Sequence, residues 1–274
     1  MPTLRLVVSL GAIALTGAAL LGSGAALAAG GGAASSHKGI LPPKNPSTSL
    51  APDPSFLLSA HCAGGKDGSK CNSIVLKAVA HARKVLEKKM GGMSFSLSAY
   101  EKLTPAEQLF VTVNLERTER GLPAAAVLTR SLDKVAQAGA NSDRDPQLSK
   151  VPDPLPGGGR PAGIGGNWAG GWDNALGADY AWMYDDGLGS GNADCTRTNK
   201  SGCWGHRDNI LGTFSSSAIC GGGRNELAMG AGHVTKGKAY GDSETELLAG
   251  VCGPTPTDAV LTWAKARSLL HIRA

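Results

Sequence analysis

The distribution of the cysteines constrains the fold of this chain more than any other feature of its sequence. All six cysteines follow an apolar stretch at the N-terminus. An even cysteine count in an exported chain favours disulfides, and the absence of any Cys-x-x-Cys pair argues against zinc. Sequence proximity favours the pairs Cys62–Cys71, Cys195–Cys203 and Cys220–Cys252, although the sequence leaves other pairings open.

The N-terminal stretch is interpreted as a signal peptide covering residues 1–28. It carries a single charge, Arg5, followed by an apolar run, and it ends in the small-x-small pattern Ala26-Leu27-Ala28. The run is long enough to span a bilayer, so a retained anchor is the alternative, but its many glycines favour cleavage. We therefore expect a secreted, extracellular chain that begins at Ala29. No later stretch is apolar enough to predict a membrane span in the mature chain.

Composition and charge indicate the domain organisation. The formal net charge of +5 is mild and scattered, so no nucleic-acid partner is predicted. Residues 29–55 are rich in Gly, Ala, Ser and Pro and are expected to form a flexible linker. Residues 56–102 are expected to form a helical extension. The main domain is expected at residues 103–274.

The main domain is predicted to open with a helix that begins at Pro105. The segment Thr104-Pro105-Ala106-Glu107 is a capping box with proline at the first helical position, and Gly121 supplies a stop signal after Arg120. A second helix is expected to begin near Thr129 or Ser131.

The remaining pattern favours an α+β fold, because helices precede strands and one helix closes the chain. The expected elements are a long loop over 145–166, a short strand over 167–169, a helix from Asp173 or Asn174 to Trp182 or Met183, strands over 226–234 and 244–251, and a C-terminal helix over 258–270.

The best candidate for a functional side chain is His206, in the run Gly205-His206-Arg207-Asp208-Asn209-Ile210-Leu211. An imidazole titrates near neutral pH and can bind a metal or donate a hydrogen bond. The pair Asp185 and Asp186 lies shortly upstream and could raise its own proton affinity by mutual repulsion. A structural role for His206 is the alternative. His233 falls in a predicted strand, where it is either half-buried or directed into a cleft.

The order of these motifs resembles the CAP superfamily, the SCP-like extracellular domain of cysteine-rich secretory, antigen 5 and pathogenesis-related 1 proteins. The resemblance rests on Asn114-x-x-Arg117-x-x-x-Gly121-Leu122, on Gly166-Asn167-Trp168-Ala169, on Trp182 and on the run over 205–211, and it covers residues 103–253. It implies an α-β-α sandwich of CAP type, here with an N-terminal helical extension. It also implies a cleft lined by two histidines and two acidic residues that can hold a divalent metal.

This chain lacks two of the four cleft residues, the two histidines and two acidic residues, that the family pattern implies. His206 matches one histidine, and Asp185 or Asp186 stands near one acidic position. The usual Gly-Glu-Asn element reads Gly165-Gly166-Asn167, so its glutamate is missing, and the other histidine is replaced in a region that holds Asn141, Asp143 and Asp145. The cleft candidates are therefore His206, Asp185, Asp186, Asn167 and His233. The resemblance implies at most weak divalent-metal binding at His206 and Asp186, and no other cofactor is predicted.

Three hypotheses for function follow from these residues. The leading one is a secreted, non-enzymatic CAP-like domain that binds an unknown ligand or a cell-surface component through a cleft near His206. The first alternative is a metal-assisted hydrolase that uses His206 with Asp185 or Asp186. The second alternative is a structural module of the cell envelope, tethered by residues 29–55.

Overall fold

The computed structural model describes residues 43–47, 68–88, 90–172, 174–214, 220–223 and 225–273. The expected signal peptide, most of the expected linker, the first residues of the helical extension and Cys62 lie outside these ranges.

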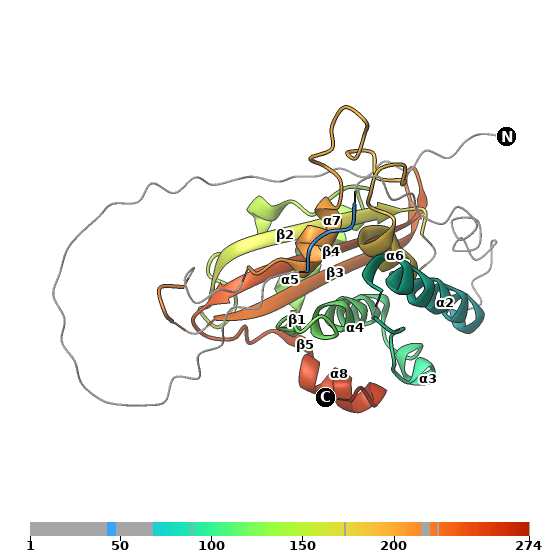
Figure 1. The fold of residues 1–274 in the computed structure, drawn as a ribbon. Coiled ribbons are helices and arrows are strands. Elements are labelled where there is room, and N and C mark those ends of the chain that lie inside the picture. The colour runs from blue at the N-terminus through green and yellow to red at the C-terminus, as the bar shows by residue number, and fades with distance from the viewer. Residues whose placement is uncertain are drawn as a thin grey trace, which may run out of the picture.

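A five-stranded mixed sheet forms the centre of the molecule (Figure 1). Its spatial order is β2-β4-β3-β1-β5. The strands are β1 (Ala125–Thr129), β2 (Arg160–Gly170), β3 (Asn225–Gly237), β4 (Gly241–Cys252) and β5 (Ala259–Thr262). Strands β3 and β4 form a long antiparallel hairpin, β2 pairs with the outer edge of β4, and β1 runs parallel to β3.

Helices cover both faces of this sheet (Figure 1). The main-domain helices are α4 (Pro105–Thr118), α5 (Arg130–Ala140), α6 (Ala175–Tyr184), α7 (Gly205–Leu211) and α8 (Trp263–Leu270). Alternation along β4 separates the two cores, since Leu248 belongs to the large cluster with α4 and α6 while Leu247 packs with Leu132 of α5. The α+β class is therefore confirmed, with helices on either side of one sheet.

Helix starts follow the predicted capping residues. Thr104 and Glu107 form the reciprocal capping box of α4, in which the Glu107 N–H donates to Thr104 Oγ1 over 3.3 Å. Thr129 caps α5, and Asn174 caps α6 by accepting from the Gly177 N–H. These caps depend on residues three positions apart, which explains why local sequence predicts them.

The sequence predictions missed or shortened three strands. Strand β1 was not expected from the sequence. Strand β2 begins at Arg160, so the predicted loop over 145–166 is wrong in its last seven residues. The predicted C-terminal helix is wrong in its first turn, because β5 occupies 259–262 before α8 begins. Pro161 and the glycines of β2 are tolerated because β2 is an edge strand with a register shift near Gly163.

The helical extension packs into the same core as the main domain. Its described part consists of α2 (Gly68–Glu87) and the single turn α3 (Leu97–Tyr100). Val75 and Val79 of α2 are fully buried in the large cluster, as is Tyr100 of α3. A buried ionic contact completes this docking, since Arg83 Nη2 lies 2.8 Å from Glu116 Oε2 on α4.

The ionic contact belongs to a larger cluster, here called the arginine network: Arg83, Glu87, Glu116, Arg120, Tyr184 and Arg207. Glu116 also pairs with Arg120 and accepts from the Tyr184 hydroxyl over 2.7 Å. Glu87 pairs with Arg120 and, over 3.0 Å, with Arg207 Nη2. Burial by itself raises the pKa of Glu116, but Arg120 and Arg83 outweigh it and lower that pKa to about 2.

Two disulfides join described cysteines as predicted. Cys195 pairs with Cys203 at a Cα–Cα separation of 4.4 Å, and Cys220 pairs with Cys252 at 5.4 Å. The predicted Cys62–Cys71 pair includes Cys62, which falls outside the described residues. No helix in the described ranges is long and apolar enough to cross a membrane.

Candidate functional site

The candidate site is built around α7, whose first turn is held by a carboxylate from the preceding loop. Trp204 precedes α7 in the left-handed backbone region, with φ of 66°, and its own side chain caps nothing. Asp186 supplies the cap from outside the helix, because its Oδ2 accepts from the His206 N–H at 3.0 Å and the Arg207 N–H at 3.3 Å. Gly187 makes this approach feasible, since a Cβ there would lie 2.6 Å from the Trp204 ring.

His206 and Asp186 form a buried ion-pair geometry. His206 Nδ1 lies 2.6 Å from Asp186 Oδ1, which also accepts from Asn192 Nδ2 at 2.6 Å. Both side chains are almost completely buried. Burial raises the pKa of Asp186 despite His206, and Asp186 raises the pKa of His206 against the opposing effect of burial. Both groups are therefore more readily protonated than in solution.

The other ring nitrogen, His206 Nε2, is buried and makes no hydrogen bond within the described part of the chain. Asp145 lies close enough for the two charges to interact, and burial raises the pKa of Asp145 to about 7 in spite of His206. Asp145 comes from the segment after α5, the region in which the sequence resemblance implies a second histidine that this chain lacks. The sequence placed Asp145 in this region without assigning it a role.

Asn167 connects α7 to the sheet. Its Nδ2 donates to the His206 carbonyl at 3.0 Å and to Glu246 Oε1 at 2.8 Å, while its Oδ1 accepts from Asn209 Nδ2 at 2.8 Å. Glu246 lies opposite Asn167 in the register of β2 and β4 and is fully buried. Burial raises the pKa of Glu246 to about 8, and nearby Arg117 only partly opposes this. The sequence missed Glu246 because its partner comes from another strand.

The two remaining predicted residues do not join His206. Asp185 ends α6 and is buried, which raises its pKa to about 8, with a smaller contribution from Asp186. His233 pairs with Glu244, with 2.6 Å between Nδ1 and Oε1, on neighbouring positions of β3 and β4. The structure therefore brings Asp186 and Asn167 to His206, and gives His233 a carboxylate of its own.

These residues do not fit a divalent-metal centre. No group of three or more His, Cys, Asp or Glu in the described ranges is arranged to hold an ion. In addition, Nδ1 of His206 is engaged with Asp186, and both oxygens of Asp186 already accept hydrogen bonds. Of the predicted ligands His206 and Asp186, only one imidazole nitrogen is left, which is fewer than the three protein ligands that a typical catalytic zinc requires.

The outward side of α7 contacts a segment from the expected linker. Residues 43–47 run beside α7 (Figure 1), and Asn45 Nδ2 donates to Asp208 Oδ1 over 2.7 Å. Asp208 is exposed, in contrast to its neighbours His206 and Arg207. Helix α7 thus has a buried side fixed by polar contacts and an exposed side that already accepts an amide from an extended segment.

Comparison with known proteins gives no relative for this arrangement: no family model, no curated protein and no solved structure matches the chain.

Proposed function

We propose that this chain is a secreted, non-enzymatic CAP-like domain that binds a cell-surface component at the exposed side of α7, next to His206. The observation that carries the proposal is the hydrogen bond from the Asn45 amide to Asp208. Asn45 lies between Pro43 and Pro46, and proline favours an extended backbone in such a segment. The α7 surface therefore accepts an amide N–H presented by an extended polymer, and a ligand with the same group could replace Asn45.

The buried side of α7 supports this function by keeping the surface rigid. Asp186 fixes the first turn, Asn167 fixes Asn209 from the sheet, and Arg207 donates to the Met183 carbonyl over 3.0 Å. A rigid platform loses little conformational entropy on binding, so contacts at Asp208 contribute to affinity. In this role His206 positions α7 and does not touch the ligand.

The chemistry of Asp208 suggests an N-acetylated polymer as the ligand class, because an acetamido group offers the same N–H donor as Asn45. The test measures co-sedimentation of the purified chain with insoluble chitin and peptidoglycan. Cellulose serves as the matched polymer, since it lacks the acetamido groups of chitin. We expect binding to the first two and not to cellulose.

Two variants test the contact itself. Asp208→Ala removes the acceptor and is expected to reduce binding by about tenfold, the value of a hydrogen bond to a charged group. Asn45→Ala removes the internal competitor and is expected to strengthen binding. Lys200→Ala, an exposed change in the loop before α7, is the control. Equal binding by Asp208→Ala and the control would overturn the proposal.

A hydrolase is the second candidate, and the unpartnered His206 Nε2 is the observation that favours it. A buried imidazole held by a carboxylate could act as a general base if a substrate reached that nitrogen. The test is hydrolysis of simple esters and amides by the purified chain and by His206→Gln. Turnover that is lost in His206→Gln, with an unchanged circular dichroism spectrum, would favour this candidate over the binding domain.

A further inference from the structure

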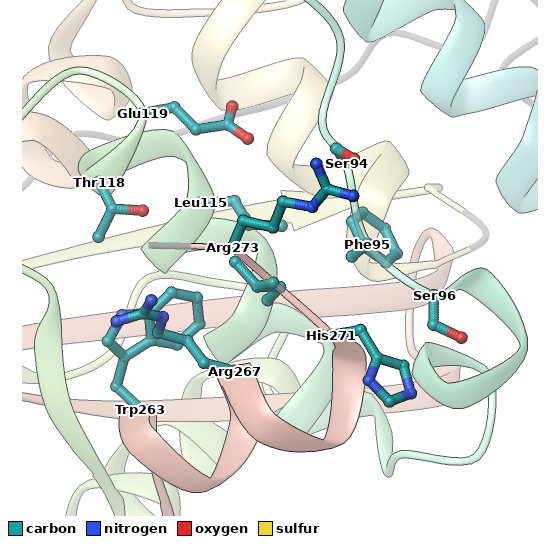
Figure 2. Close-up of a pocket in the computed structure, with 11 residues that line it drawn as sticks. Ser94, Phe95, Ser96, Leu115, Thr118, Glu119, Trp263, Arg267, His271 and Arg273 are labelled. Atoms are coloured by element: carbon teal, nitrogen blue, oxygen red, sulfur yellow. The ribbon is translucent and has the colours of Figure 1, made fainter.

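A second site is formed beside the C-terminal end of α4, by residues other than those around His206. A cavity of about 910 Å³ lies between α4, the segment 94–96 and the C-terminal helix α8 with its tail (Figure 2). Its apolar lining comes from Phe95, Leu115, Trp263 and Ile272. This volume falls in the range of small-molecule binding pockets, which are typically apolar with a few polar groups.

The walls of this cavity are fixed by backbone contacts and aromatic packing. The Ser96 N–H donates to the Leu270 carbonyl at 2.9 Å, which ties the segment 94–96 to α8. The tail returns over α8 because His271 adopts the left-handed region, so the Ile272 N–H reaches the Arg267 carbonyl at 3.0 Å. Trp263 packs edge-on against Phe110, with 6.3 Å between ring centroids. The cavity is thus pre-formed.

Two cations line the cavity without a partner of opposite charge in the part of the chain that the structure describes. Arg267 and Arg273 form no ion pair or side-chain hydrogen bond with any described residue. Figure 2 shows Arg273 extending from the tail towards Ser94 and Phe95, while Arg267 rises from α8 one turn after Trp263. The acidic residue of the lining, Glu119, is already paired with Arg83. The cavity therefore offers two guanidinium groups, without an ion-pair partner among the described residues, above an apolar floor.

We propose that this cavity binds a small organic anion with an apolar body, such as a medium-chain carboxylate. The apolar body would lie against Leu115, Phe95 and Trp263, and the anionic head would be bound by Arg267 and Arg273. Guanidinium groups suit this role because they form paired hydrogen bonds with a carboxylate. An inorganic anion would leave the apolar lining unfilled, and an uncharged apolar compound would leave both arginines unpaired.

The test uses the fluorescence of anilinonaphthalene sulfonate, an aromatic anion, bound to the purified full chain. Decanoate is then titrated as the competitor, and decanol is the matched competitor with the same chain and no charge. Decanoate should displace the probe saturably at concentrations at least about tenfold below those of decanol, as expected for a charge-assisted contact. Failure of decanoate to displace the probe, or equal displacement by decanol, would refute the proposal.

Surface variants separate this site from general charge effects. The double variant Arg267→Gln/Arg273→Gln should weaken decanoate binding at least about tenfold. Lys265→Gln is the control, because Lys265 is exposed on the same helix and does not line the cavity. If the double variant binds decanoate as Lys265→Gln does, the proposed head-group site is wrong.

A third variant tests the cavity without changing charge. Thr118 on α4 lines the cavity and is only partly buried, so Thr118→Met should fill space without breaking the core. Binding of both the probe and decanoate should be lost, while the thermal midpoint stays close to that of the unchanged chain. Retained decanoate binding in Thr118→Met would place the ligand elsewhere and overturn the proposal.

Discussion

Glu116 in the arginine network and the carboxyl groups near His206 are all buried, yet their pKa values shift in opposite directions. In the network, Arg120 and Arg83 lower the pKa of Glu116 to about 2. Around His206, the pKa values of Asp185 and Glu246 rise to about 8, because burial is not offset by a paired cation. Burial raises the pKa of every one of these groups, so the nearby cations decide whether each is charged.

This difference separates a scaffold of paired charges from a region with an excess of buried acidic groups. Guanidinium groups contact both carboxylates of the network, which joins α2 to α4, α6 and α7. The His206 region holds more acidic groups than cations and leaves Nε2 of the ring without a partner among the described residues. Three predictions test this contrast, from the largest expected effect to the smallest.

Glu116→Ala should destabilise the chain most. The substitution leaves Arg83 and Arg120 buried without their shared carboxylate, and breaking a buried pair in this way costs about 3–5 kcal/mol. Urea unfolding provides the measurement. Asp153→Ala, which breaks the exposed Arg160–Asp153 pair, is the control and should leave the midpoint unchanged. Similar midpoints for the two variants would mean that the network does not hold α2 in place.

Glu246→Gln should change how stability depends on pH. The pKa of Glu246 rises from an ordinary 4.5 to about 8 on folding, so its contribution is complete below pH 4.5 and is lost as pH rises to 8. Glutamine mimics the protonated acid and keeps the acceptor for Asn167. The variant should therefore gain about 2–4 kcal/mol over the unchanged chain at pH 8, and little at pH 4.

Glu116→Gln is the comparison variant for the pH dependence of stability. The lowered pKa of Glu116 gives stability that is present above pH 4.5 and lost as pH falls towards 2, which is the opposite sign. The denaturant midpoint of Glu116→Gln should lie below that of the unchanged chain at high pH, and this difference should disappear in acid. Parallel pH profiles for Glu246→Gln and the unchanged chain would contradict the assigned protonation of Glu246.

Thr104→Ala should have the smallest effect, about 0.5–2 kcal/mol, because it removes only the exposed cap of α4. The loss concerns the first turn, whereas Glu116 lies in the last turn of the same helix. Denaturant midpoints should fall slightly, and the pH profile set by Glu116 should stay unchanged. Glu107→Gln, which keeps an acceptor for the Thr104 N–H, serves as the milder control.

Local rules predicted those parts of the fold that depend on neighbours in sequence. The caps at Thr104, Thr129 and Asn174 satisfy amides within three residues, and Cys195 pairs across a separation of 8 residues. Strand β1 escaped prediction because its pairing with β3 joins Ala125 to Leu227, far apart in the chain. A short apolar segment has no period that distinguishes a strand from a loop before its partner is known.

The candidate site likewise has features that the sequence predicts and features that only the tertiary structure shows. The sequence by itself determined that His206 follows an acidic pair, and it predicted that Asn167 lies on a strand. Only the tertiary structure decided that Asp186 and not Asp185 binds His206, that Glu246 faces Asn167, and that Asp145 lies near the ring. The tertiary structure also decided the charge states, because burial and distant cations set the pKa of a carboxyl group. Neither is encoded in the residues adjacent to that group in the sequence.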